Sequence, residues 1–208
     1  MMPGPTRIMK APGCKKPVKI STIASGNTFG ATFWTDGKKE APMLPDEPWL
    51  LKSPVEEKLF WADECEEIGQ IDNWDSKPVN KEWTKLAFAE EPGEKDYFAA
   101  LTSDIANTDE KKRYLRMRLW WRGNDDIRRG KKDILSKAHL DNLSAFAELL
   151  SSEDPDQRLM KAEIYRELNR FTEAKKLITF KYPKGYSSAV KLIRTLIESQ
   201  DSRVAELK

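Results

Sequence analysis

The hydrophobic pattern of this 208-residue chain changes its period once, near residue 80. Before that point, short runs of β-branched and aromatic residues alternate with turns rich in glycine, proline and asparagine, which is typical of short antiparallel strands. After it, apolar residues recur every three to four positions, which is typical of amphipathic helices. Strands followed by helices favour the α+β class. We therefore predict a small antiparallel β module followed by an α-helical array.

Four short strands are predicted in the β module, over residues 18–23, 29–35, 49–52 and 59–62. Turn residues stand between them, with Ser25-Gly26-Asn27 after the first strand and Asp36-Gly37 after the second. We expect aromatic side chains to supply much of the core, because each buries roughly 150–250 Å². These aromatic residues are Phe29, Phe33, Trp34, Trp49, Phe60 and Trp61.

The helical array is predicted from capping residues as well as from periodicity. Asn80 and Thr108 are N-cap residue types, and Gly123-Asn124 is a stop signal for the helix that begins after Thr108. The predicted helices cover 80–89, 93–101, 108–122, 134–152, 156–169, 171–179 and 186–199. The periodicity is lost between the two modules. We therefore predict a β module over 1–66, a linker over 67–79 and a helical module over 80–208.

Two stretches in the β module resemble the metal-binding knuckles of a zinc ribbon that has lost most of its cysteines. In "PGCKKP", Cys14 stands at the first ligand position and Pro17 at the second, and in "KSPVEEKLFW" the ligand positions hold Ser53 and Glu56. A structural zinc ion needs four ligands, usually thiolate or imidazole, and one of the four remains. The resemblance implies a ribbon-like fold, which we predict to hold no metal. An improvised zinc site that uses Cys65 and Glu56 is the alternative.

The stretch "KAEIYRELNRFTEAKKLI" resembles a tetratricopeptide repeat. The small residues Ala162 and Ala174 allow two antiparallel helices to approach, Tyr165 and Phe171 fill the space between them, and Asn169 stands where a glycine-like residue is expected. The match covers one repeat of about 34 residues, whereas a self-supporting groove normally needs three. The resemblance implies a short helical array. The whole arrangement also resembles a group of uncharacterised bacterial proteins that contain "SGNTxGAxxWxDGKxxAPMLP".

The first candidate binding surface lies within residues 25–38. The residues Asn27, Thr28, Asp36 and Lys38 are polar and are predicted at turns, beside an aromatic face that includes Trp34. Core packing does not explain why these four residues are polar, so we predict that they contact a partner together with Trp34. Gly37-Lys38-Lys39 lacks both the upstream glycine at the required spacing and the following Ser or Thr, so this stretch is not a phosphate-binding loop.

The second candidate surface is the basic, tryptophan-containing segment over 111–132. Its candidate residues are Arg113, Arg116, Arg118, Trp120 and Arg122. In the favoured interpretation, the arginines pair with carboxylates and the tryptophans pack inside the protein. In the alternative, arginines interleaved with Trp120 offer charge and stacking to a nucleic acid.

Composition and motifs exclude several functions. The 36 basic and 34 acidic residues leave a net charge of +2, so any long-range field is weak. No apolar run reaches the length of about 18 residues that spans a bilayer, and the N-terminus lacks the apolar centre of a signal peptide. Two cysteines do not form a disulfide framework. We therefore predict a cytoplasmic protein that does not bind membranes.

An enzymatic function is not supported by any motif. His139 is the only histidine, and no nucleophile elbow, P-loop, dinucleotide fingerprint or metalloprotease motif is present. We predict neither cofactor nor metal. The prediction for function is a non-enzymatic adaptor that binds another protein, with nucleic-acid binding by the segment over 111–132 as the alternative. The sequence predicts no oligomeric state.

Overall fold

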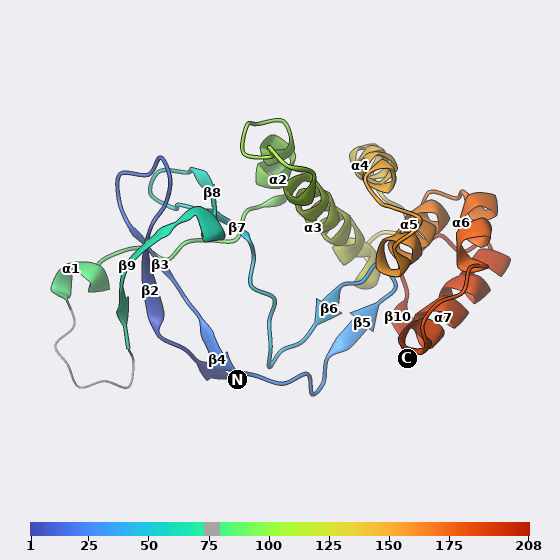
Figure 1. Ribbon diagram of the computed structural model, residues 1–208, viewed down its shortest axis with the longest axis horizontal. Coiled ribbons are helices and arrows are strands. Elements are labelled where there is room, and N and C mark those ends of the chain that lie inside the picture. The colour runs from blue at the N-terminus through green and yellow to red at the C-terminus, as the bar shows by residue number, and fades with distance from the viewer. Residues whose placement is uncertain (73–79) are drawn as a thin grey trace. The chain divides into compact units, whose positions relative to one another are not determined.

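The computed structural model describes residues 1–72 and 80–208 and confirms the α+β class, with strands mainly in the first third and helices after it (Figure 1). The described chain forms two compact units. The first, which we call the β unit, contains Met1–Ala31 and Glu40–Asp96. The second, the helical unit, contains Thr32–Lys39 and Tyr97–Lys208.

The β unit is built from short antiparallel strands. Their bounds are β1 Met2–Pro3, β2 Thr6–Lys10, β3 Val18–Ile20, β4 Ile23–Ser25, β7 Leu50–Lys52, β8 Leu59–Trp61 and β9 Glu66–Ile71. Strands β3, β2 and β9 form one sheet in that order, β7 pairs with β8, and β1 pairs with β4. The segment 87–90 joins two of these sheets, because its backbone bonds to Lys19 of β3 and to Lys52 of β7. The short helix α1, Lys81–Thr84, precedes this segment.

The core of the β unit is more aliphatic than the sequence indicated. Phe60 and Trp61 are buried as expected, whereas Phe29 and Trp49 are 82% and 45% exposed. The prediction of a largely aromatic core was therefore wrong. Strand β2, which was not predicted, contributes the fully buried side chains of Ile8 and Met9 to the interior. The core cluster consists of Met9, Ala11, Cys14, Val18, Leu51 and Phe60.

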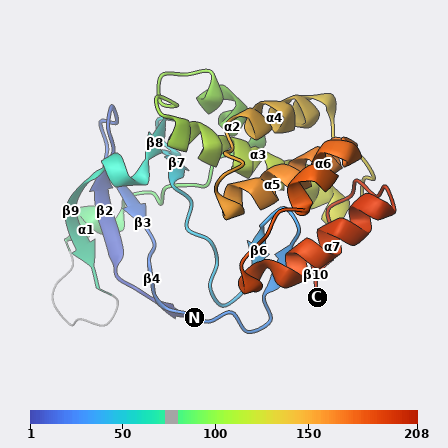
Figure 2. The same ribbon diagram turned by 45° about the vertical axis from the view of Figure 1, so that its right-hand side comes forward.

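The helical unit contains the part of α2 from Tyr97 onward, five further consecutive helices and most of one small sheet, because the unit boundaries fall within α2 and within β6. The helix bounds are α2 Glu94–Leu101, α3 Asp109–Arg128, α4 Lys137–Glu148, α5 Pro155–Glu167, α6 Phe171–Ile178 and α7 Ser187–Glu198. Each helix from α3 to α7 packs against the next (Figure 2). The strands β10 Glu206–Leu207, β5 Thr32–Trp34 and β6 Lys39–Glu40 form the sheet in that order.

Local signals account for most helix boundaries. The side chains of Thr108, Ser136 and Asp154 each accept a hydrogen bond from the backbone N–H three residues later. Helix α5 ends before Asn169, whose φ of 60° is the left-handed conformation expected of a glycine-like residue. The predicted packing of α5 on α6 is confirmed. Its buried cluster consists of Ala162, Ala174, Ile178, Ile193 and Ile197, with Tyr165 and Phe171 packed against it.

Three predicted helices differ from the structure by more than two residues at an end, and one of them, predicted over 134–152, covers only Lys137–Glu148. The first helix stops at Thr84, because 87–90 are held between strands. Helix α3 runs through Gly123 to Arg128 instead of stopping there. A Cβ atom on Gly123 would lie 2.5 Å from Cδ2 of His139, so this glycine permits close approach of α4 and does not end the helix.

The division of the chain also differs from the predicted boundaries. Residues 67–71 of the predicted linker belong to strand β9, Glu66–Ile71, and residues 73–79 of that linker lie outside the described residues. Residues 32–39 belong to the helical unit although they precede most of the β unit in sequence. No helix in the described ranges is long and apolar enough to cross a bilayer.

Candidate functional site

The first half of the predicted binding segment forms an exposed turn in the β unit. The side-chain oxygen of Asn27 accepts a hydrogen bond of 3.0 Å from the backbone N–H of Phe29. The backbone N–H of Ala31 donates to the carbonyl of Thr28 at 3.0 Å. Asn27 and Thr28 are exposed, so both are open to a partner, and the prediction that they bind one stays a prediction.

The second half of the segment packs into the helical unit. Asp36 is buried, and its carboxylate accepts hydrogen bonds from Arg128 and, at 3.0 Å, from Nδ2 of Asn124. Lys38 pairs with Asp125, and the guanidinium of Arg128 lies 5.3 Å from the ring centroid of Trp34. Burial raises the pKa of Asp36, and Arg128 opposes that rise. These contacts explain the polarity of Asp36 and Lys38 without a partner.

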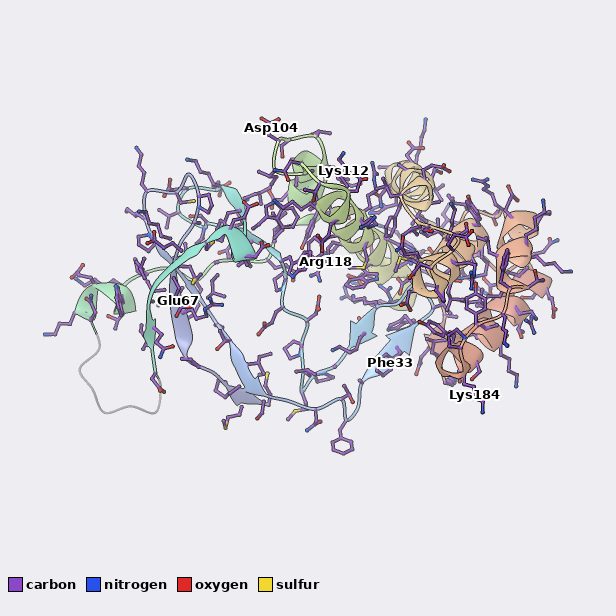
Figure 3. The ribbon with its side chains drawn as sticks, in the orientation of Figure 1. Phe33, Glu67, Asp104, Lys112, Arg118 and Lys184 are labelled. Atoms are coloured by element: carbon purple, nitrogen blue, oxygen red, sulfur yellow. The ribbon has the colours of Figure 1, made fainter. Side chains whose placement is uncertain are left out.

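The residues of the basic helix α3 that were predicted to bind a partner are buried or half-buried. Trp120 is 1% exposed, so its ring is not open to stacking with a base in this structure. Arg118 is buried, within 5.4 Å of the ring centroid of Trp121; Figure 3 labels it on α3. Arg116 donates to the side-chain oxygen of Asn142 at 3.2 Å, and burial lowers its pKa. The last two candidates, Arg113 and Arg122, are half-buried.

A buried polar cluster links α3 to α5, and sequence reasoning missed it. Glu167 accepts a hydrogen bond of 2.8 Å from Nε1 of Trp120 and bonds of 3.1 and 3.2 Å from Nδ2 of Asn124. The same amide group bonds Asp36, so Asn124 joins two buried carboxyl groups. Burial, with Glu163, raises the pKa of Glu167 to about 8. The Gly-Asn pair suggested a helix end, which concealed this role.

Hydrogen bonds connect the two knuckle-like stretches in the β unit, from Lys15 and Lys16 of the first to Glu56 of the second. Oε1 of Glu56 accepts from the backbone N–H groups of Lys15 and Lys16 at 2.8 and 3.0 Å, and the N–H of Glu56 donates to Oγ of Ser53 at 3.3 Å. Burial raises the pKa of Cys14, with a further contribution from Glu56. Among the described residues, no group of three or more Cys, His, Asp or Glu could hold a metal ion. The donor set therefore does not fit a four-ligand zinc site.

An open groove in the β unit is the remaining candidate site, and it was not predicted. Its volume is about 450 Å³. Its apolar lining includes Ile20, Leu51, Ala62 and Ala89, which also belong to or pack against the core cluster. The groove is therefore a place where the core reaches the surface.

Two large aromatic side chains also line the groove. Trp49 is 45% exposed and Phe88 is 46% exposed. Lys19 helps to fix Phe88, since its ammonium nitrogen lies 4.3 Å from the ring centroid. Glu47 and Glu91 add negative charge to the lining.

Comparison with protein-family models, curated proteins and solved structures finds no match to this chain. Its function must therefore be inferred from its own residues and their geometry.

Sequence reasoning missed the groove because it placed both aromatic residues elsewhere. Trp49 was predicted as core and Phe88 as part of a helix, whereas both stand at the surface. One signal was present in the sequence. Trp49 follows "PDEP", a polar and proline-rich run that is typical of a surface segment.

Proposed function

We propose that this chain is a non-enzymatic adaptor whose β unit captures a segment of a partner protein in the groove lined by Trp49 and Phe88. The observation that carries the proposal is that two large aromatic rings stay about half exposed above an apolar lining. Covering the exposed half of each ring would remove on the order of 80 Å² from water, which is worth about 2 kcal/mol per ring. A groove of this kind therefore favours binding of apolar side chains.

The two units have separate parts in this proposal. The β unit is a ribbon-like module in which hydrogen bonds replace metal ligands, supported by the bonds that Glu56 accepts. The helical unit is a short tetratricopeptide-like array, supported by the burial of Ala162 and Ala174 between α5 and α6. We place the adaptor in the bacterial cytoplasm, because both cysteines are free thiols and thiols stay reduced there.

A peptide-display selection on the immobilised full-length protein tests the proposal. We expect a family of peptides to be enriched on the natural protein and lost on Trp49→Ala and Phe88→Ala. Phe29→Ala is the matched control, because Phe29 is an exposed aromatic residue of the same unit outside the groove. Circular dichroism checks that each variant keeps its fold. A selection that enriches nothing, or that enriches the same peptides on all variants, would refute the adaptor function of this groove.

A further inference from the structure

The groove's flanking strands leave little opportunity for strand addition. The backbone groups of Lys19 in β3 and Lys52 in β7 already form hydrogen bonds with the segment 87–90. The N–H of Lys19 donates to the carbonyl of Ala87 at 2.9 Å, and its own carbonyl accepts from Ala89 at 2.8 Å. Lys52 exchanges two such bonds with Glu90, at 2.9 and 3.0 Å. An occupant would therefore be held by side chains and not by a ladder of backbone hydrogen bonds.

A polyproline II segment meets that condition. Its backbone makes no internal hydrogen bonds and stays solvated, so it loses nothing when no strand edge is offered. Such segments dock their proline rings into grooves lined by aromatic side chains. Trp49, Phe88 and Pro48 provide flat apolar surfaces of this kind in the groove.

The charge around the groove favours a basic occupant. Glu47 and Glu91 line it, and Arg7, which also lines it, pairs with Glu67 at 2.7 Å. By sequence, the β unit carries eleven basic and sixteen acidic residues, a net charge of −5, whereas the helical unit carries a net charge of +7. The β unit therefore attracts cationic segments although the whole chain is nearly neutral.

We infer that the groove lined by Trp49 and Phe88 binds a proline-rich segment that carries arginine or lysine, in the polyproline II conformation. This inference rests on the proposed adaptor function and specifies its partner chemistry. The aromatic side chains recognise the proline rings, and the acidic side chains recognise the flanking cations. Specificity then comes from both features together, because either one alone leaves part of the groove unmatched.

Fluorescence anisotropy with a labelled twelve-residue peptide of repeating Arg-Pro-Leu-Pro tests the inference on the full-length protein. Two matched probes replace every proline by glycine or every arginine by glutamate. We expect the first peptide to bind, and each replacement to weaken binding roughly tenfold or more. Trp49→Ala and Phe88→Ala should weaken binding by a similar factor, while Phe29→Ala should leave it unchanged.

The acidic lining has a separate readout. A double variant, Glu47→Gln with Glu91→Gln, should weaken binding severalfold and reduce its dependence on salt, because exposed charges are screened by added ions. Glu82→Gln is the control, since Glu82 is an exposed acidic residue of the β unit outside the groove lining. Equal salt dependence in the double variant and the control would show that Glu47 and Glu91 do not attract the cations of the peptide.

Several outcomes would overturn the inference. Binding of the glycine probe as tightly as the proline probe would reduce recognition to net charge. Binding that survives Trp49→Ala would place the peptide elsewhere. Self-association of the protein in light scattering that is abolished by Trp49→Ala would assign the groove to a second copy. Enrichment of peptides without proline or basic residues in the display selection would refute this partner chemistry but leave the adaptor function standing.

Discussion

The substitution Glu167→Gln tests whether the buried side chain of Glu167 is a neutral acid or an ionised carboxylate in the folded protein. Glu167 lies in the buried cluster of the helical unit, where Trp120 and Asn124 donate hydrogen bonds to it. Burial, with Glu163, raises its pKa to about 8 from the usual value of 4.5. We therefore expect the folded protein to keep this proton at pH values where the unfolded chain has lost it.

The sign and size of the effect follow from proton linkage. Between the unfolded and folded pKa values, the folded state binds more protons, so the free energy of unfolding falls as pH rises. The contribution of Glu167 is fully present below the unfolded pKa and is lost as pH rises through about 8. One proton corresponds to about 1.4 kcal/mol per pH unit, which sums to about 5 kcal/mol over the whole window.

Urea unfolding followed by far-ultraviolet circular dichroism provides the assay, at several pH values between about 5 and 8. The free energy of unfolding of Glu167→Gln, minus that of the natural protein, should rise with pH by about 1.4 kcal/mol per unit. The dependence of this difference on pH is compared because the altered hydrogen bonds add only a constant to the difference. The control is Glu198→Gln, an exposed glutamate on α7, for which the difference should stay flat.

A flat difference for Glu167→Gln would refute this reasoning. It would mean that the carboxyl group is ionised in the folded state throughout the range. The buried cluster would then contain one more negative charge than we assign to it, and the protonation of its members would have to be assigned again.

Three further predictions concern stability and thiol chemistry. In urea unfolding, Arg128→Met should lower the free energy of unfolding of the helical unit by about 3–5 kcal/mol, because it leaves buried carboxylates unpaired. The control Lys132→Met changes a lysine side chain that is 64% exposed and should cost less than about 1 kcal/mol. Gly123→Ala should destabilise the packing of α3 on α4 by about 1–3 kcal/mol in thermal unfolding, while Gly185→Ala, where a methyl group meets open space, should cost nothing comparable. Burial raises the pKa of Cys65 to about 11, so in native protein this thiol should react with Ellman's reagent at mildly alkaline pH roughly a hundredfold more slowly than in urea, and rates within tenfold of each other would contradict its burial.

Helix positions were predictable because their signals are local. A cap residue such as Thr108 acts on the N–H groups of the next turn, and the periodicity beyond it reflects a single buried face. The packing of Ala162 against Ala174 was equally accessible, since the residues belong to one helical hairpin. The α+β class follows from these same short-range patterns.

The buried polar cluster could not be predicted, because its members are distant in sequence. Asp36 meets Asn124 and Arg128 only after the chain has folded back on itself, and each of the three alone looks like a surface residue. Strand β9 was missed for a related reason. Its register comes from pairing with β2, and its own sequence, "EEIGQI", lacks a strong strand pattern.

The groove was hidden by a general weakness of sequence patterns. Apolar residues are usually inside, so Trp49 was predicted as core, and only the positions of neighbouring strands show that its ring is left uncovered. Aliphatic residues that line the groove belong to the core cluster or pack against it, so nothing in their sequence pattern indicates the opening above them. Exposure of this kind is recognised only when the packing is known.

The hairpin over 32–39 has a consequence for how the protein is made. Asp36 is translated about 90 residues before its partners Asn124 and Arg128, an interval of roughly 4–18 s at about 5–20 residues per second. Its buried partners do not exist during this time, and strand β5 gains its β10 neighbour only after residues 206–207 have been translated. All segments of the β unit are available once Asp96 has emerged. During synthesis, the β unit can therefore fold first, while the hairpin stays exposed to water until the helices that bury it have been translated.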